Sequence, residues 1–285
     1  MDVRLLGSET VAAGRLSRHE LRSRFSALYP NVYLPDGTNI TAHTRARAAW
    51  LWSRRQGVVA GRSAAALHGA NWVDPDKPAQ LIHTNRHAPR GIQTWTYDLA
   101  GDEIQTAGGI VLTTPARTAL DLACSLPVDR AVAEVDALAN ATGLKPADVE
   151  LLVQRYPGRR GIRTAREVLG LVDGGAESPR ETWLRLLFIR AGYPPPTTQI
   201  PIYNEFGVLV AVADMGWEDL KIAVDYEGSH HRTPRRFNTD IRRHDEVTDL
   251  GWIDLRVTSL DTEAVILNRM AKAWERRGRT PPTVH

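Results

Sequence analysis

Acidic side chains gather on two predicted strands in the last third of the chain. Residues 219–226 alternate between apolar and polar side chains, so Asp225 and Glu227 face the same side, with Cα atoms about 6.5–7 Å apart. Asp214 lies near the end of the preceding predicted strand, where a hairpin would bring it close to Asp225. Carboxylates gathered in this way repel one another unless they bind a divalent cation, and oxygen ligands suit Mg²⁺ or Mn²⁺. We therefore expect a metal site held by Asp214 and Asp225.

Three further side chains are candidates for hydrolytic chemistry beside such a metal. Glu181 closes the capping box Ser178-Pro179-Arg180-Glu181, which opens a predicted helix. A glutamate is favoured there for capping alone, so its catalytic and structural roles both stay open. Glu227 follows Asp225 on the same strand face, and His231 comes shortly after it. These groups would orient water or move protons, while the metal stabilises charge on a phosphate.

Arginines that would hold nucleic acid lie in two places. Arg235, Arg236 and Arg243 belong to a basic segment on a predicted helix just beyond the carboxylates, where they would hold backbone phosphates. For Arg243, an ion pair within its own helix is the alternative. Near the N-terminus, Arg18 and Arg22 lie on a short predicted helix, where the alternative to DNA contact is a solvated helix face.

The elements that must position the acids follow one another in a simple order. A helix over 179–191 ends at Gly192 and precedes an antiparallel meander of strands. A further strand and a closing helix come after the basic segment. The predicted strands cover 198–203, 208–215, 219–226 and 252–257, and the predicted closing helix covers 261–276.

Several motifs occur in order along this region: Ser178-Pro179-x-Glu181, Asp214-x-x-Trp217, Val224-Asp225-Tyr226-Glu227-Gly228-x-x-His231, Asp240-x-x-Arg243, Leu250-Gly251-Trp252 and Arg256. Together they resemble the very-short-patch-repair endonuclease relatives of the PD-(D/E)xK restriction-endonuclease superfamily. The resemblance implies that Asp214 is the principal metal ligand, Asp225 the second acid and Glu181 the acid carried by the helix. It also implies that Glu227 replaces the lysine of the superfamily.

Two departures from that pattern affect the expected chemistry. The relatives usually carry Glu-x-Asp-Gly, whereas this chain has Asp225-x-Glu227-Gly228, so the reach of each carboxylate differs by one methylene. The missing lysine leaves the activation of water without an assigned residue. His231 or a second water is the expected substitute.

The N-terminal part predicts a different module. Ser17-Arg18-His19-Glu20 is a capping box that predicts a helix over 18–24, and a strand pair follows within 27–35. A small helix followed by a strand pair is the outline of a winged helix. Beyond it the sequence predicts helices over 44–56, 63–68, 114–124, 128–141 and 145–154, and strands over 80–84, 93–97 and 110–113.

This part also resembles a known family. The motifs are Leu16-Ser17-Arg18-x-x-Leu21, Asn31-Val32-Tyr33 and Gly61-Arg62-Ser63-Ala64-Ala65-Ala66-Leu67-His68-Gly69. They are similar to the winged-helix region of AbiEi-type antitoxins. That family represses transcription and neutralises a partner toxin, so the resemblance implies DNA and a cognate toxin as partners.

Composition limits the class of protein. Hydrophobic residues make up 42% of the 285 residues and charged residues 24%, which is typical of a globular chain and excludes a disordered or fibrous one. The only cysteine, Cys124, excludes an internal disulfide and a Cys-rich metal site. The apolar runs are too short to span a bilayer, so we expect a cytoplasmic protein with no membrane partner.

These observations predict an α+β fold in three parts. The expected domains are a winged-helix-like DNA-binding region over 1–75, a mixed strand and helix region over 76–172, and an endonuclease-like α/β domain over 176–285. The leading hypothesis is a metal-dependent DNA endonuclease that uses Mg²⁺ or Mn²⁺. The alternative is a non-enzymatic antitoxin or transcriptional regulator with a degenerate nuclease core.

Overall fold

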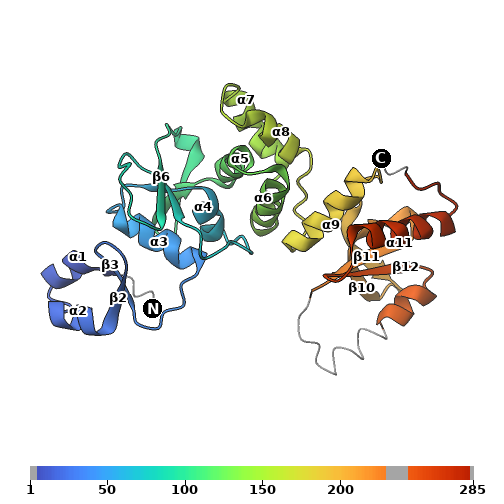
Figure 1. The fold of residues 1–285 in the computed structure, drawn as a ribbon, viewed down its shortest axis with the longest axis horizontal. Helices are drawn as coiled ribbons and strands as arrows, with labels where there is room; N and C mark the ends of the chain where they lie inside the picture. The colour runs from blue at the N-terminus through green and yellow to red at the C-terminus, as the bar shows by residue number, and fades with distance from the viewer. Residues whose placement is uncertain (1–4, 229–242, 283–285) are drawn as a thin grey trace. The chain divides into compact units, whose positions relative to one another are not determined.

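The computed structural model describes residues 5–228 and 243–282, and its fold is of the mixed α+β kind (Figure 1). The chain divides into two compact units, Met1–Val172 and Asp173–His285. Each unit has its own hydrophobic core, built only from residues of that unit.

The N-terminal part of the first unit is a small sheet with two helices. Helix α1 spans Gly7–Ala12 and helix α2 spans Arg18–Arg24. The predicted capping box is present, because the Ser17 hydroxyl accepts from the Glu20 backbone N–H and the Glu20 carboxylate accepts from the Ser17 N–H. The sheet is antiparallel in the order β1-β3-β2, with strands β1 (Leu5–Leu6), β2 (Phe25–Tyr29) and β3 (Val32–Pro35).

A five-stranded sheet in the order β6-β5-β4-β8-β7 forms the middle of the first unit. Its strands are β4 (Val58–Val59), β5 (Ala79–Ile82), β6 (Ile92–Trp95), β7 (Ile104–Ala107) and β8 (Ile110–Thr113). Helices α3 (Ala42–Trp52) and α4 (Gly61–Leu67) pack small alanine side chains into its core. Tyr29 and Val32 of the N-terminal sheet belong to the same core, so the boundary expected at residue 75 falls inside one compact unit.

Four helices complete the first unit, and buried charges connect one of them to the sheet region. They are α5 (Pro115–Ser125), α6 (Val128–Thr142), α7 (Pro146–Arg155) and α8 (Ile162–Leu169). Arg117 of α5 donates to Asp121 Oδ1 at 2.9 Å and to Glu103 Oε2 at 2.5 Å. Glu103 ends the short 3₁₀ helix η1 (Gly101–Glu103), and all three charged residues are buried. Opposite charges with hydrogen bonds make this burial tolerable.

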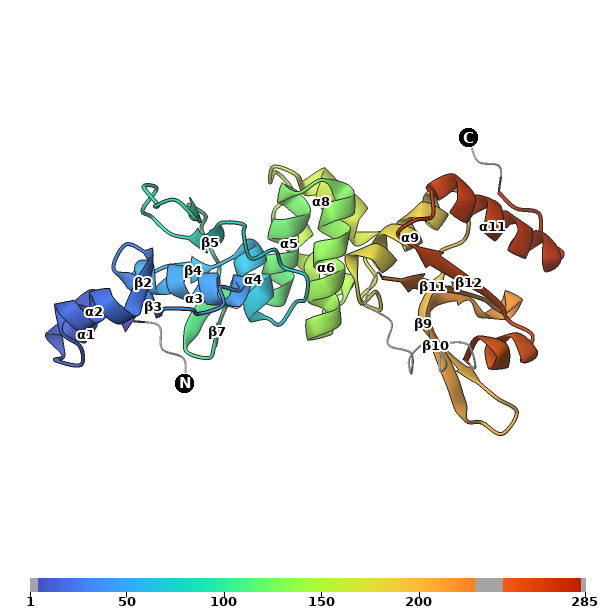
Figure 2. The same cartoon turned by 60° about the horizontal axis from the view of Figure 1, so that its bottom comes forward.

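The second unit is a four-stranded sheet with helices (Figure 2). The sheet has the order β12-β11-β10-β9, in which the first three strands along the chain form the predicted antiparallel meander and β12 pairs parallel to β11. Its elements are α9 (Pro179–Arg190), β9 (Thr197–Tyr203), β10 (Leu209–Trp217), η2 (Glu218–Leu220), β11 (Ile222–Glu227), helical residues 243–249, β12 (Ile253–Thr258) and α11 (Glu263–Arg276).

Aromatic side chains dominate the core between the sheet and helices α9 and α11. Trp274 of α11 packs edge-on against Tyr193 and against Trp217 of β10, with ring centroids 5.1 Å apart in both pairs. Phe188 of α9 is fully buried in the same cluster. The first turn of α9, which carries Glu181, lies within electrostatic reach of Asp214 in β10 and Asp225 in β11.

Candidate functional site

Two of the predicted acids meet where strands β10 and β11 part. The last ladder pair is Met215 opposite Val224, so Asp214 and Asp225 occupy the next opposed positions. The Asp214 backbone N–H donates to Asp225 Oδ1 at 2.9 Å, and the Tyr226 N–H donates to Asp214 Oδ2 at 2.7 Å. Each carboxylate therefore satisfies a backbone donor of the opposite strand. The two side chains that the sequence predicts as metal ligands therefore form hydrogen bonds that connect the two strands.

Glu181 approaches this pair from the first turn of α9. It is 8% exposed, and its carboxylate accepts from the Glu177 backbone N–H at 2.7 Å and from the Ser178 hydroxyl at 2.8 Å. Burial raises the pKa of Glu181, and the negative charges of Glu177 and Asp225 raise it further. Glu181 thus hydrogen-bonds at the start of its helix and also lies within electrostatic reach of Asp225.

The grouped carboxylates are electrostatically unfavourable as three anions. Burial raises the pKa of Asp214 to about 7, and the charges of Asp225 and Glu181 add to that rise against the opposing Tyr226 N–H. Burial also raises the pKa of Asp225, while the Asp214 N–H and the Arg243 guanidinium oppose the rise. The site consequently favours either a bound proton or a bound cation near neutral pH.

Basic side chains border the carboxylates on one side. Arg243, in helical residues 243–249, donates to the Val212 carbonyl at 2.6 Å and lies 3.5 Å from Asp225 Oδ2. Arg256 of β12 donates to Glu227 Oε1 at 3.1 Å. Glu227, which the sequence resemblance places at the position of the superfamily lysine, is thus the ion-pair partner of Arg256 on the neighbouring parallel strand.

A further acid beside this group was not singled out from the sequence. Asp254 of β12 accepts from Arg256 Nε at 3.0 Å, and its Oδ2 lies 2.6 Å from His244 Nδ1. Its side chain is 3% exposed, and its charge contributes to the raised pKa of Asp225. The only signal in the sequence is that Asp254 and Arg256 are two residues apart on a predicted strand, so their side chains lie on the same face.

The donor set has the chemical type that Mg²⁺ or Mn²⁺ requires, but the conformation is not that of a formed metal centre. In the described residues, no group of three or more His, Cys, Asp or Glu side chains is arranged to hold a metal ion. Asp214, Asp225 and Glu181 each direct one oxygen toward a backbone N–H. His231, Arg235 and Arg236, which the sequence assigns to proton transfer and phosphate contact, lie outside the described residues.

The predicted DNA-contacting arginines of the first unit lie on the exposed side of α2. Arg18 and Arg22 are both exposed and one helical turn apart, whereas Leu21 of the same helix is buried in the unit. Arg15 and Arg24 are exposed at either end of the helix. Strands β2 and β3 follow α2 directly.

Comparison with known protein families identifies part of the first unit. The family described as "AbiEi antitoxin C-terminal domain" matches residues 57–171. This supports the AbiEi-like prediction for the middle region. The motif at 61–69, which was expected in the winged-helix region, falls instead within the matched C-terminal domain, and the two more N-terminal motifs precede the matched range. No solved structure matches the chain significantly. None of the helices in the described part of the chain has the length and apolar character that crossing a bilayer requires.

Two curated relatives come from Mycobacterium tuberculosis. "Uncharacterized protein MT2308" of strain CDC 1551 / Oshkosh and "Uncharacterized protein Rv2248" of strain ATCC 25618 / H37Rv are each 37% identical to this chain over 191 residues. The alignment covers 67% of this chain and 70% of each relative. The chain therefore belongs to the family of these two mycobacterial proteins, and its residues 57–171 match the AbiEi antitoxin C-terminal domain.

Proposed function

We propose that the protein is a DNA-binding regulator of the antitoxin type, which binds DNA near its N-terminus and a cognate toxin through its AbiEi-like domain. The observation that carries this proposal is the match of residues 57–171 to the AbiEi antitoxin C-terminal domain. That segment shares its compact unit with a basic helix and a strand pair, the outline of a winged helix.

DNA contact is proposed for the exposed face of α2. Arg18 and Arg22 project from one face, and no ion pair engages either of them among the described residues. Arginine forms bidentate hydrogen bonds with phosphate oxygens, and every neutralised phosphate releases counterions. The β2–β3 pair would then lie beside the duplex as the wing.

Fluorescence anisotropy with random-sequence and selected duplex DNA tests this part of the proposal. The double variant Arg18→Glu/Arg22→Glu should weaken binding at least tenfold at low salt, and the salt dependence of binding should fall by about two phosphate contacts. The control is Arg163→Glu/Arg166→Glu, which reverses two exposed arginines of α8. Equal binding by wild type and the α2 variant would exclude α2 as the DNA-contacting element.

Toxin binding requires a separate test, because it assigns a different partner to the chain. Each protein encoded beside this one is expressed alone and together with it. One of them should arrest growth when alone, and co-expression should relieve the arrest and allow the two chains to co-purify. If co-expression relieves no arrest, the antitoxin role is wrong even where DNA binding holds.

A second candidate function, metal-dependent DNA cleavage by the second unit, is favoured by the convergence of Asp214, Asp225 and Glu181. The raised pKa of Asp214 indicates an anionic site that a divalent cation would relieve. Asp214 and Asp225 would hold Mg²⁺ or Mn²⁺, and the bound cation would supply an activated water and charge stabilisation at the scissile phosphate. Glu181 would orient that water, and Arg243 would hold an adjacent phosphate oxygen.

Calorimetric titration with Mg²⁺ and Mn²⁺, followed by incubation with supercoiled plasmid, tests the nuclease candidate. Wild type should bind the cation and nick the plasmid, and Asp214→Ala should do neither. Asp219→Ala, which removes an exposed acid of η2, serves as the control and should behave as wild type. An absence of binding and nicking in wild type, with duplex DNA still bound, would leave the regulator as the sole function.

A further inference from the structure

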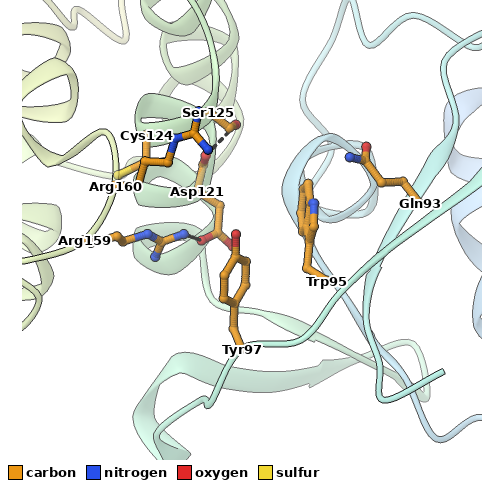
Figure 3. A pocket seen from close by; sticks show the side chains of 8 residues that line it. All are labelled: Gln93, Trp95, Tyr97, Asp121, Cys124, Ser125, Arg159 and Arg160. Atoms are coloured by element: carbon orange, nitrogen blue, oxygen red, sulfur yellow. Dashed lines mark hydrogen bonds and ion pairs between the residues drawn. The ribbon is translucent and has the colours of Figure 1, made fainter. Parts of the chain in front are cut away.

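A pocket of about 420 Å³ lies within the AbiEi-like domain and shares no lining residue with the sites described above (Figure 3). Figure 3 shows Trp95 and Gln93 on one side of it, and Tyr97, Asp121 and two arginines on the other. Its volume is in the range of small-molecule sites. It is lined by Gln93, Trp95, Tyr97, Asp121, Cys124, Ser125, Arg159 and Arg160.

The aromatic walls of the pocket are suited to a flat ligand. The rings of Trp95 and Tyr97 have centroids 6.2 Å apart and are inclined at 38°. Tyr97 is 47% exposed, and the Arg159 guanidinium lies 5.3 Å from its ring centroid. Trp95 is half-buried, so one part of its indole packs into the domain while another part faces the pocket. Exposed aromatic faces beside arginines are the usual stacking surfaces for nucleobases.

Asp121 lines the pocket and carries a buried, unsatisfied acceptor. Its side chain is 2% exposed, and its Oδ1 accepts from Arg117 Nε at 2.9 Å and from Arg159 Nη2 at 2.5 Å. Its Oδ2 is buried and has no hydrogen-bond partner among the described residues. A buried acceptor without a donor is costly, so a donor from a ligand would be favourable there. Tyr97 lies beside this carboxylate in Figure 3, and a ligand donor would reach Oδ2 with a local shift of the side chains around it.

Arg160 supplies a positive charge at the pocket. It is exposed, and no ion pair engages it among the described residues, whereas its neighbour Arg159 is paired with Asp121 at 2.5 Å. Arg159 therefore forms part of the pocket wall, whereas Arg160 is exposed to solvent at the pocket. An exposed guanidinium at the edge of an aromatic pocket suits a phosphate group.

We propose that this pocket binds a nucleotide. The base would stack on Trp95, an N–H of its polar edge would donate to Asp121 Oδ2, and the phosphate would bind Arg160. One nucleotide carries the flat ring, the donor and the anion that these three side chains require. The nucleotide is either free in solution or an unpaired residue of a single strand, and the experiment distinguishes these sources.

Isothermal titration of the full chain tests the proposal with the four ribonucleoside monophosphates and with short single-stranded oligonucleotides. Trp95→Leu and Arg160→Glu should each weaken binding by about tenfold or more. Arg163→Glu, an exposed arginine of α8 that does not line the pocket, is the matched control and should bind as wild type. Because Trp95 also packs near Gly61, thermal unfolding must show that Trp95→Leu remains folded. Arg160→Glu, at an exposed position, is independent of that concern.

The two probes and the two pocket variants distinguish the possible ligands. Binding of a monophosphate that both pocket variants weaken supports a free nucleotide as the ligand. Binding of oligonucleotides alone, weakened by the same variants, supports an unpaired nucleotide of a strand. Absence of binding by either probe, or binding that neither variant weakens, overturns the proposal. The Arg18→Glu/Arg22→Glu variant should retain pocket binding, so failure of the DNA-binding function and failure of this inference give different results.

Discussion

Asp214 lies among carboxylates that cannot all be ionised without cost, and its ionisation affects the stability of the second unit. Its pKa in the folded chain, about 7, is above the ordinary value of 3.8. A raised carboxyl pKa means that the folded state binds the proton more tightly than the unfolded state. The resulting stabilisation is complete below about pH 4 and is lost as the pH rises through about 7. The slope reaches at most about 1.4 kcal/mol per pH unit.

Asp214→Asn should remove this pH dependence. The variant should unfold at a higher temperature than wild type at pH 8 without divalent cations, and the difference should shrink toward pH 5. Asparagine can still accept the Tyr226 N–H, so the strand contact is preserved. Calorimetry at both pH values measures the effect, with Asp219→Asn as an exposed control. Parallel pH profiles for wild type and Asp214→Asn would show that Asp214 has an ordinary pKa.

Arg117 is a buried cation at the centre of an ion-pair network in the first unit. Its guanidinium neutralises Glu103 and Asp121, and all three side chains are at most 3% exposed. Arg117→Met keeps much of the volume but leaves Glu103 with Arg155 and Asp121 with Arg159 as their remaining arginine partners, so it should destabilise the first unit by about 2–4 kcal/mol in urea denaturation. Arg130→Met, which removes the more exposed partner of Glu134, should cost under about 1 kcal/mol. Similar losses for both variants would contradict the role assigned to burial.

At the scale of elements, two glycines have similar backbone conformations but differ in how closely other atoms surround them. Gly143 caps α6 and Gly161 precedes α8, and both have positive φ, 70° and 84°. A Cβ at Gly143 would meet nothing within 4 Å, whereas a Cβ at Gly161 would lie 2.1 Å from the Cys124 carbonyl oxygen. The surroundings therefore differ although the backbone conformations are alike.

Gly143→Ala should cost about 1–2 kcal/mol, which is the penalty for a side chain in the left-handed region. Gly161→Ala carries the same penalty and must also push α8 away from the end of α5, which should add about 1–3 kcal/mol or more. Urea denaturation of both variants measures the difference. Equal losses would mean that the contact between Gly161 and Cys124 relaxes freely.

Element boundaries were largely predictable because local rules determine them. The capping box of Ser17 and Glu20 begins α2 at the predicted residue, the Ser178 side chain caps the start of α9, and proline opens α5 and α9. The very short strand β4 and the strand β7 were not predicted. Two residues such as Val58–Val59 carry no periodicity, so only their partners in β5 and β8 define them as a strand.

At the scale of the whole molecule, the two compact units should fold independently, because each has its own core. Fragments 1–172 and 173–285 should each unfold cooperatively in calorimetry, and their transitions should account for those of the full chain within a few degrees. The first fragment should retain DNA binding, and the second should retain any cation binding. An unfolded fragment 173–285 would show that the second unit depends on the first.

The sequence alone determined the order of most of the elements, the acids on neighbouring strands and the AbiEi-like character of the middle region. These follow from signals within short stretches, namely capping motifs, apolar periodicity and ordered motifs. Only the tertiary structure decided how distant residues meet. It brought Glu181 within reach of Asp225, paired Glu227 with Arg256 and buried Asp254 beside His244. It also assembled a pocket from residues 93–97, 121–125 and 159–160. Such contacts depend on packing between remote elements, which no local pattern encodes.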